Sequence, residues 1–300
     1  MRLVTFLAAG RPRAGIVSED EAVRAIDDLV PGGPTDMVAC IERWGGIGPR
    51  MRATARSGVT GTRLAEARLL APIPRPRRNV LCVGWNYREH FEEGRSSRSD
   101  AAPQELPAHP AVFTKSAAAV VGPDAPVRHP GPHSAALDWE VELAVIVGRG
   151  GRDIPEGTAL DHVFGYTIAN DVSVRDVQRA HGGQWFKGKS FDTHCPLGPW
   201  IVTADEIPDP QVLPIGSRVN GETKQSSNTR HMVFTVARIL AELSAGMALE
   251  PGDVILTGTP PGVGFARTPP QFLEVGDVME MEIGGIGVLR NRIVPYGAEL

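Results

Sequence analysis

The feature that most limits the fold of this chain is a series of short apolar runs separated by glycine- and proline-containing turns. The runs NVLCVGWNY (79–87), ELAVIVG (142–148) and DVILTGT (253–259) each have the length of a single strand. The 300 residues include 34 glycines and 26 prolines without a low-complexity tract, and turns this frequent favour short strands over long helices. We therefore expect a β-rich α+β fold with short helices.

Two stretches have helical spacing. In FTVARILAELSAG, the apolar residues Phe234, Ile239 and Leu243 share one face, and Gly246 is suited to end the helix. In TDMVACIERW, the apolar residues also recur at helical intervals, and Thr35 is the expected N-cap. The first of these is the clearest helix that the sequence predicts.

The chain changes character near Arg78. The preceding segment APIPRPRRNV (71–80) contains three prolines, which is typical of a linker between folded parts. We predict a small N-terminal α/β domain with its linker over residues 1–78, and a larger catalytic domain over residues 79–300.

Composition excludes several classes of protein. The net charge is −4, whereas a nucleic-acid-binding domain usually carries a basic face. The cysteines Cys40, Cys82 and Cys195 are too few and too widely spaced to form a disulfide framework. Apolar runs fall short of the roughly 18 residues of a membrane span. We expect a cytoplasmic protein that binds neither nucleic acid nor membrane.

The strand LDWEVELAVIVG carries acidic side chains on one face. With a period of two, Asp138, Glu140 and Glu142 point to one side, and Trp139 and Val141 point to the other. Unpaired carboxylates are costly to bury, so a bound cation would explain them, and two acids at i and i+2 can ligate one ion. A solvent-facing strand with a few acids is an equally acceptable interpretation of this segment alone.

A further acid, Asp171, follows the apolar strand VFGYTIA where the chain enters a helical turn. An acid at the end of a strand often belongs to a functional site, although Asp171 could also cap the turn that follows it. Together with Glu140 and Glu142 it would give three oxygen ligands without histidine or cysteine. Such a set suits Mg²⁺, with Mn²⁺ or Ca²⁺ as alternatives, rather than Zn²⁺.

The segment GWNYREHFEE contains a histidine and a carboxylate one helical turn apart. His90 and Glu93 are at i and i+3 and would lie side by side. A carboxylate beside an imidazole orients the ring and raises its basicity, as a general base requires. Glu89 and Glu92 are competing partners, and a surface ion pair is the simpler alternative.

Two other segments could contact an anionic substrate. Lys189 lies in WFKGKSFD and could supply positive charge, although the neighbouring Lys187 is equally placed by sequence. The glycine-rich segment LTGTPPGVG could offer backbone N–H groups to a carboxylate, and it lacks the GK[ST] ending of a nucleotide P-loop. The polar stretch from Gly94 to Pro110 is expected to form a long loop.

Taken in order, several of these segments resemble the fumarylacetoacetate hydrolase family. The resemblance is carried by GWNYREHFEE, VFTKS, LDWEVELAVIVG, GYTIANDVSVRDVQ, KGKSFDTHCPLGPW, VNGE, ILTGTPPGVG and GDVMEMEIGGIGVLRN. It covers the chain from Asn79 to Val294. It implies a mixed β-sheet roll with short helices, in a homodimer.

The resemblance also implies roles for individual residues. A divalent cation would be held by Glu140, Glu142 and Asp171, and the histidine–glutamate dyad would be His90 and Glu93. The remaining predicted roles are the catalytic Lys189 and the substrate contacts Lys115, Arg175, Gln178 and Thr259. Family members that cleave fumarylacetoacetate itself take a further metal-binding aspartate from an N-terminal position, for which this chain has no clear equivalent.

The activity that the resemblance implies is hydrolysis of a C–C bond in a 2,4-dioxo acid such as an acylpyruvate, through a metal-stabilised enolate, in the catabolism of aromatic compounds. Decarboxylation of an oxaloacetate-type 2-oxo acid and isomerisation of a 2-hydroxyhepta-2,4-diene-1,7-dioate share the same enolate and metal. They remain alternatives. A different class of protein, a binding module for metal and 2-oxo acid without catalysis, is opposed by the complete set of site residues.

Overall fold

The computed structural model describes residues 1–54, 60–95 and 103–299. Its main element is a 12-stranded sheet whose central order is β4-β3-β2-β1-β14-β12-β11-β17-β6-β7, with β5 paired to β1 and β8 to β14. Its strands are β1 (Arg2–Ala8), β2 (Arg11–Val17), β3 (Ala22–Ala25), β4 (Thr62–Arg63), β5 (Leu69–Leu70), β6 (Val80–Gly84), β7 (Ala111–Lys115), β8 (Val120–Val121), β11 (Val141–Val147), β12 (Val163–Asn170), β14 (Cys195–Thr203) and β17 (Val254–Leu256).

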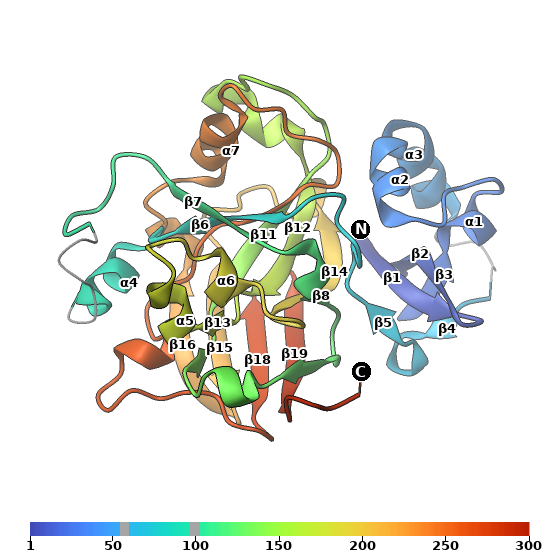
Figure 1. Ribbon diagram of the computed structural model, residues 1–300. Coiled ribbons are helices and arrows are strands. Elements are labelled where there is room, and N and C mark those ends of the chain that lie inside the picture. The colour runs from blue at the N-terminus through green and yellow to red at the C-terminus, as the bar shows by residue number, and fades with distance from the viewer. Residues whose placement is uncertain (55–59, 96–102, 300) are drawn as a thin grey trace.

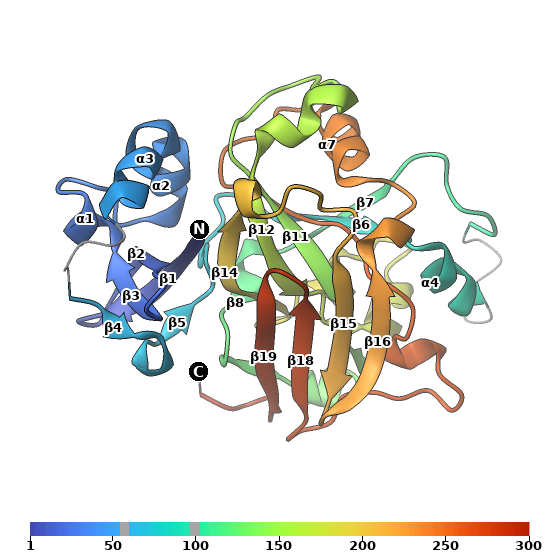
Figure 2. The same cartoon turned by 180° about the vertical axis from the view of Figure 1, so that it is seen from behind.

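A second, five-stranded sheet lies against the large one, as Figure 2 shows from behind. Its strands, in spatial order, are β16 (Glu222–Asn228), β15 (Pro214–Val219), β18 (Val278–Ile283), β19 (Gly287–Val294) and β9 (Pro126–Arg128). A separate short pair joins β10 (Leu137–Asp138) to β13 (Ser173–Val174). Sheets of this size with antiparallel and parallel pairs confirm the predicted β-rich α+β class.

The helices are short, as expected from the many turns. They are α1 (Ile26–Leu29), α2 (Met37–Glu42), α3 (Trp44–Thr54), α4 (Arg88–Glu93), α5 (Arg175–Ala180), α6 (Phe186–Lys189) and α7 (Val236–Ser244). Short 3₁₀ turns occupy Leu64–Glu66, Ala117–Ala119, Gly131–His133, Glu156–His162, Ala204–Glu206, Thr229–His231 and Gly264–Ala266. No helix within the three described ranges combines the length and apolar character needed to cross a membrane.

The clearest predicted helix is α7, which begins after Thr235 and buries Ile239 and Leu243. The Thr235 side chain accepts a hydrogen bond from the backbone N–H of Arg238, and Gly246 follows the last turn with φ +73°. The N-cap predicted for the earlier helix is wrong. Helix α2 is capped by Asp36 rather than Thr35, because the carboxylate of Asp36 accepts from the N–H of Ala39, three residues on.

The middle of the large sheet, at β11, is buried on both faces. On one face Leu143 and Val145 of β11 pack with Met281 and Leu289 of the five-stranded sheet. On the other face Ala144 and Ile146 belong to a core that also contains Met37 and Ile41 of α2. Beyond Glu142, strand β11 is a continuous apolar run because neither of its faces meets water.

The N-terminal segment continues the large sheet instead of standing apart from it. Strand β1 pairs antiparallel with β14 through Arg2–Val202 and Leu3–Ile201, and the helices α1 to α3 lie beside it (Figure 1). Its core is shared with Val80 of β6. The predicted boundary near Arg78 thus falls where the chain leaves β5 and enters β6. The predicted loop from Gly94 to Pro110 contains no strand in the residues after 102, and positions 96–102 lie outside the described residues.

Candidate active site

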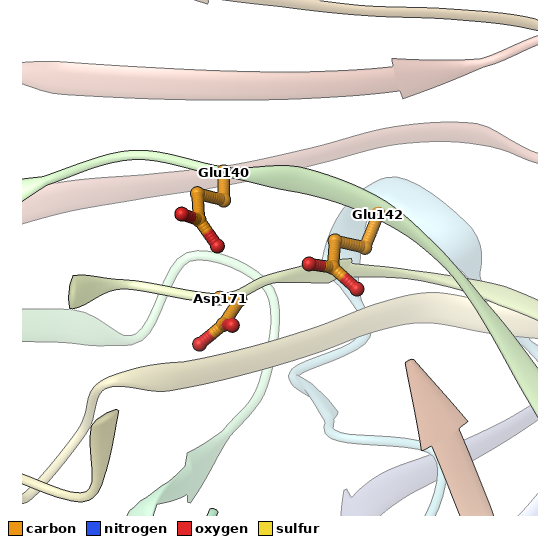
Figure 3. A group of neighbouring side chains, drawn as sticks. All are labelled: Glu140, Glu142 and Asp171. Atoms are coloured by element: carbon orange, nitrogen blue, oxygen red, sulfur yellow. The ribbon is translucent and has the colours of Figure 1, made fainter. Parts of the chain in front are cut away.

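Three buried carboxylates meet where β11 begins and β12 ends. Glu140 immediately precedes β11, Glu142 is its second residue, and Asp171 directly follows β12. The antiparallel register pairs Glu142 with Ala169, and the backbone N–H of Asp171 donates to the carbonyl of Glu140 at 2.9 Å. One oxygen from each carboxylate lies within 4.8 Å of the others, and Figure 3 shows the three side chains converging.

Asp138, which was expected on the same face as Glu140 and Glu142, does not join this cluster. The regular strand is interrupted between Asp138 and Val141. The carboxylate of Asp138 accepts hydrogen bonds from the N–H groups of Gly264 (2.7 Å) and Phe265 (3.1 Å) and from Nε of Arg175 (2.8 Å). These bonds give Asp138 a structural role beside the cluster.

Two buried lysines neutralise part of the cluster. Nζ of Lys189 donates to Oε2 of Glu140 and to Oδ2 of Asp171, both at 2.7 Å. Nζ of Lys115 donates to Oδ1 of Asp171 at 2.6 Å and to the carbonyl of Val172 at 3.0 Å. Asp171 is thus held between two ammonium groups, and its position is fixed before any ligand binds.

Arg175 is the third buried cation beside the carboxylate cluster. Its Nη2 forms an ion pair with Oε1 of Glu140 at 2.6 Å, and its Nη1 donates to Oε1 of Gln178 at 3.2 Å. The guanidinium carbon lies 4.5 Å from the centroid of the Phe265 ring. Arg175 therefore acts on Glu140 and Asp138 as a buried counter-ion.

The two glutamates of the E-x-E pair differ in charge environment. Burial opposes ionisation of Glu140, but the charges of Arg175 and Lys189 prevail and hold its pKa below the ordinary value. Burial and the negative charges of Asp171 and Glu140 raise the pKa of Glu142 well above the ordinary value. Glu142 accepts one hydrogen bond, from the N–H of Gly258 at 2.7 Å. Glu142 is therefore the carboxylate of the cluster whose negative charge is least compensated by neighbouring groups.

This donor set fits a hard divalent cation. Its ligands are carboxylate oxygens alone, they are buried, and their excess of negative charge is concentrated at Glu142. Oxygen-only sets of this kind suit Mg²⁺, Mn²⁺ or Ca²⁺. A cation placed near Glu142 would relieve the repulsion that raises the pKa of this carboxyl.

The glycine-rich segment after β17 binds the protein's own carboxylates. The N–H of Gly258 donates to Glu142, the N–H of Gly262 donates to Oε2 of Glu93 at 2.8 Å, and the N–H of Gly264 donates to Asp138. The sequence predicts that these amides meet a carboxylate, and three of them meet carboxylates of the protein itself. These hydrogen bonds align the side chains of the site.

The predicted histidine–glutamate pair is formed on α4. Nδ1 of His90 lies 2.7 Å from Oε1 of Glu93, and His90 is 8% exposed. Glu93 is anchored in turn by Gly262. His90 and Glu140 line the same cavity, so the dyad and the carboxylate cluster lie near each other although 50 residues separate the two in the sequence.

A cavity of about 760 Å³ connects these groups. Glu140, Glu142, Lys189 and His90 line its inner part. Its other walls include Trp85, Phe113 and Trp185, where Trp185 makes edge-to-face contacts with Trp85 (4.8 Å between centroids) and Phe113 (5.1 Å). Figure 1 shows α5 and α6 beside β7, with α4 beyond the end of β6.

The predicted substrate contacts divide into two groups. Arg175, Gln178 and Thr259 line the cavity, but Lys115 is fully buried behind Asp171 and is absent from the lining. The hydroxyl of Thr259 donates to the carbonyl of Val141 at 2.9 Å and accepts from Gln225, so it cannot also donate to a ligand. This arrangement favours positioning roles for Lys115 and Thr259.

Sequence reasoning missed Arg179 and Gln225. Arg179 lines the cavity one helical turn beyond Arg175, and its spacing of four residues could have revealed it. Gln225 accepts from the N–H of Val141 and donates to Thr259, bridging the two sheets. A single glutamine in β16 gives no comparable signal in the sequence.

Comparison with known proteins shows which family and fold the chain shares. The family model described as fumarylacetoacetate (FAA) hydrolase, C-terminal, matches residues 79–294. Among curated proteins, a mitochondrial oxaloacetate tautomerase of Xenopus laevis is 42% identical over 98% of this chain and 90% of its own length.

Two solved structures extend this similarity to the fold. A fumarylacetoacetate hydrolase from Exiguobacterium antarcticum is 40% identical with a TM-score of 0.83, and the match covers 98% of this chain and 99% of that one. A maleylpyruvate hydrolase from Sphingobium sp. SYK-6, in complex with manganese(II) and pyruvate, is 32% identical with a TM-score of 0.80 over 98% and 99% of the two chains.

Proposed function

The chain belongs to the fumarylacetoacetate hydrolase family, and from this premise we propose that it is a divalent-metal-dependent enzyme that interconverts the keto and enol forms of an oxaloacetate-type 2-oxo acid. The observation that carries the proposal is that His90, paired with Glu93, opens onto the same cavity as the carboxylates Glu140 and Glu142. A base and a cation site beside one cavity are the two parts that enolisation next to a carbonyl requires.

The dyad supplies the proton transfer. With Nδ1 engaged by Glu93, Nε2 of His90 is the nitrogen that takes the proton from the carbon beside the carbonyl. The C–H electron pair forms the carbon–carbon double bond, and the imidazolium returns the same proton to the carbonyl oxygen. Glu93 stabilises the transient positive charge of the ring. A divalent cation held by Glu140, Glu142 and Asp171 would supply Lewis-acid polarisation of the substrate oxygens.

Lys189 orients the acidic end of the substrate, and Arg175 maintains the charge of the cation site. The ammonium group of a lysine has three N–H donors, and Lys189 uses two of them on Glu140 and Asp171. The third is available to the substrate carboxylate. Arg175 keeps Glu140 ionised through its ion pair, which maintains the charge of the cation site. We propose Mg²⁺ or Mn²⁺ as the ion.

Hydrolysis of a C–C bond in a 2,4-dioxo acid is the second candidate. The cavity of about 760 Å³ exceeds what a four-carbon acid needs, since drug-sized ligands occupy pockets of about 300–1,000 Å³. In that reaction Nε2 of His90 would take a proton from water, and the hydroxide would add to the distal carbonyl before the C–C bond breaks. The 2-oxo acid then leaves as its enol.

A substrate panel separates these candidates. Purified protein, treated with chelator and then supplied with Mg²⁺, Mn²⁺ or buffer, is mixed with enol oxaloacetate, an acylpyruvate and a hydroxylated dienedioate, and the products are identified by NMR. We expect metal-dependent ketonisation of oxaloacetate that His90→Asn abolishes. Metal-dependent cleavage of the acylpyruvate alone would establish the second candidate. Binding of oxalate without turnover of any substrate would leave a binding module.

A further inference from the structure

We propose that Arg179 binds a second carboxylate of the substrate and so makes the site selective for 2-oxo dicarboxylic acids. This inference rests on the proposed function, because it names the class of 2-oxo acid that the same cavity takes. Arg175, Gln178 and Arg179 stand at i, i+3 and i+4 on α5, and all three line the cavity. One helical face therefore places the guanidinium groups of Arg175 and Arg179 beside the same cavity.

Arg179 differs from the other cations of the cavity in its partners. Lys189 and Arg175 are each paired with buried carboxylates. Within residues 1–54, 60–95 and 103–299, Arg179 has no ion pair and no hydrogen bond; its guanidinium carbon lies 5.1 Å from the Phe265 centroid. A guanidinium in such a place retains its full set of donors for a carboxylate.

The surroundings of Arg179 favour an anion. Arg179 is an exposed residue of the cavity lining, and desolvation by its neighbours together with the charge of Arg175 lowers its pKa. Both guanidinium groups stack on Phe265, at 4.5 Å and 5.1 Å from its centroid. A carboxylate bound to Arg179 would relieve this repulsion between like charges.

The charges of the site leave a place for a second carboxylate. Four buried acids, Asp138, Glu140, Glu142 and Asp171, face the three buried cations Lys115, Lys189 and Arg175. A divalent ion turns this excess of one negative charge into an excess of one positive charge. The first carboxylate of a 2-oxo acid neutralises that excess. A second carboxylate then has Arg179 as its partner.

The other described residues near the mouth carry no acidic side chain that would repel a second carboxylate. Among the residues that the structure describes, the acidic side chains of the lining are those of Glu140 and Glu142, and both lie in the inner part of the cavity. Near α6 the walls are formed by Trp85, Phe113 and Trp185. These rings suit the carbon chain between two carboxylates.

The test compares acids of matched length with and without a second carboxylate. Calorimetry on the Mg²⁺-loaded protein gives dissociation constants for oxaloacetate, 2-oxoglutarate and 2-oxoadipate, and for 2-oxobutyrate, 2-oxovalerate and 2-oxohexanoate. We expect Arg179→Gln to weaken the best-bound dicarboxylate by about tenfold or more, as the loss of a charge-assisted bond predicts, and to change its monocarboxylate partner by less than about twofold.

Two controls distinguish failure of this inference from failure of the proposed function. Lys187→Gln removes a nearby exposed cation that contacts Phe191 and is not part of the lining, so it should leave the preference intact. The affinity for oxalate measures ligand binding at the cation site alone. If Arg179→Gln keeps the dicarboxylate preference while oxalate still binds, the inference is wrong and the proposed function stands. If oxalate does not bind wild-type protein with Mg²⁺, the proposed function itself fails.

Discussion

The inner part of the cavity and its mouth differ in which side chains form them and in how those side chains are held. The inner part is lined by Glu140, Glu142, Lys189 and His90, and the mouth by Trp85 and Trp185. At the inner part, Glu140, Asp171 and Lys189 are buried and each makes at least two polar contacts shorter than 3 Å. At the mouth, Trp85 and Trp185 are partly exposed and touch each other by their ring edges. The hydrogen bonds indicate that the inner part is fixed before ligand binding. In the function that we propose, this part performs the chemistry and the mouth selects which acid enters.

The substitution with the largest expected effect is Asp171→Asn. It removes a cation ligand and leaves Lys115 and Lys189 without their shared carboxylate. Breaking a buried ion pair costs about 3–5 kcal/mol, so we expect both a lower free energy of unfolding and loss of Mg²⁺ binding. Urea unfolding and calorimetry measure the two effects. Unchanged stability would show that the inner part is not held by these pairs.

Glu142→Gln is the matched contrast, because Glu142 accepts from Gly258 and has no ion pair with any cation in the described part of the chain. The variant should also lose Mg²⁺ binding, yet the metal-free protein should be as stable as wild type or more so. The pKa of Glu142 is raised in the folded state, so the unfolded chain releases this proton first, near a pH of about 4.3.

It follows that metal-free wild-type protein loses stability as the pH rises above the ordinary carboxyl range, up to the raised pKa. Glu142→Gln removes that part of the loss. Unfolding curves recorded from pH 4 upward on both proteins measure the difference. Parallel curves with equal slopes would contradict the account of Glu142 as a poorly compensated charge.

His90→Asn should separate catalysis from binding at the inner part. General acid–base groups contribute about 10²–10⁴ in rate, so kcat should fall by that order while oxalate affinity with Mg²⁺ changes little. Glu93→Gln should have a smaller effect, since it keeps the ring in place but no longer stabilises its positive charge. Stopped-flow ketonisation and calorimetry give the two quantities. Equal losses of binding and rate would place His90 in ligand binding instead.

Gly84→Ala probes the mouth and should have the smallest effect. A Cβ at Gly84 would lie 2.3 Å from Cζ3 of Trp185, so the indole must move within the cavity wall. Overpacking costs about 1–3 kcal/mol; we expect a higher KM with kcat within about twofold. Gly45→Ala in α3 is the control, because no atom lies within 4 Å of its added Cβ. A large fall in kcat would show that the mouth also positions reacting groups.

The sequence predicted the inner part well because its signals are local. Two acids at i and i+2 on an apolar strand, an acid at a strand end and a histidine one turn from a glutamate each occupy a short segment. The structure brings these segments together as expected for Glu140, Glu142, Asp171, His90 and Glu93. The resemblance to one family gave the order of the segments, and the comparisons confirm that family.

The features that the sequence did not predict depend on tertiary contacts. Helix α3 contains Gly45, Gly46, Gly48 and Pro49, so local propensity argues against it. It forms because Ile47 and Met51 are buried in the core shared with β6 and β14. The role of the glycine-rich loop was likewise hidden, since its amides find three acceptors in two distant segments, Glu93 in one and Asp138 and Glu142 in the other.

The central claim is that Glu140, Glu142 and Asp171 hold one divalent cation. Anomalous diffraction from crystals grown with Mn²⁺ and oxalate tests it most directly. The account predicts one strong manganese peak within coordinating distance of all three carboxylates, with oxalate on the side of His90. A manganese peak at any other group of residues, or well-ordered crystals with Lys189 still between Glu140 and Asp171 and no peak beside them, would contradict it.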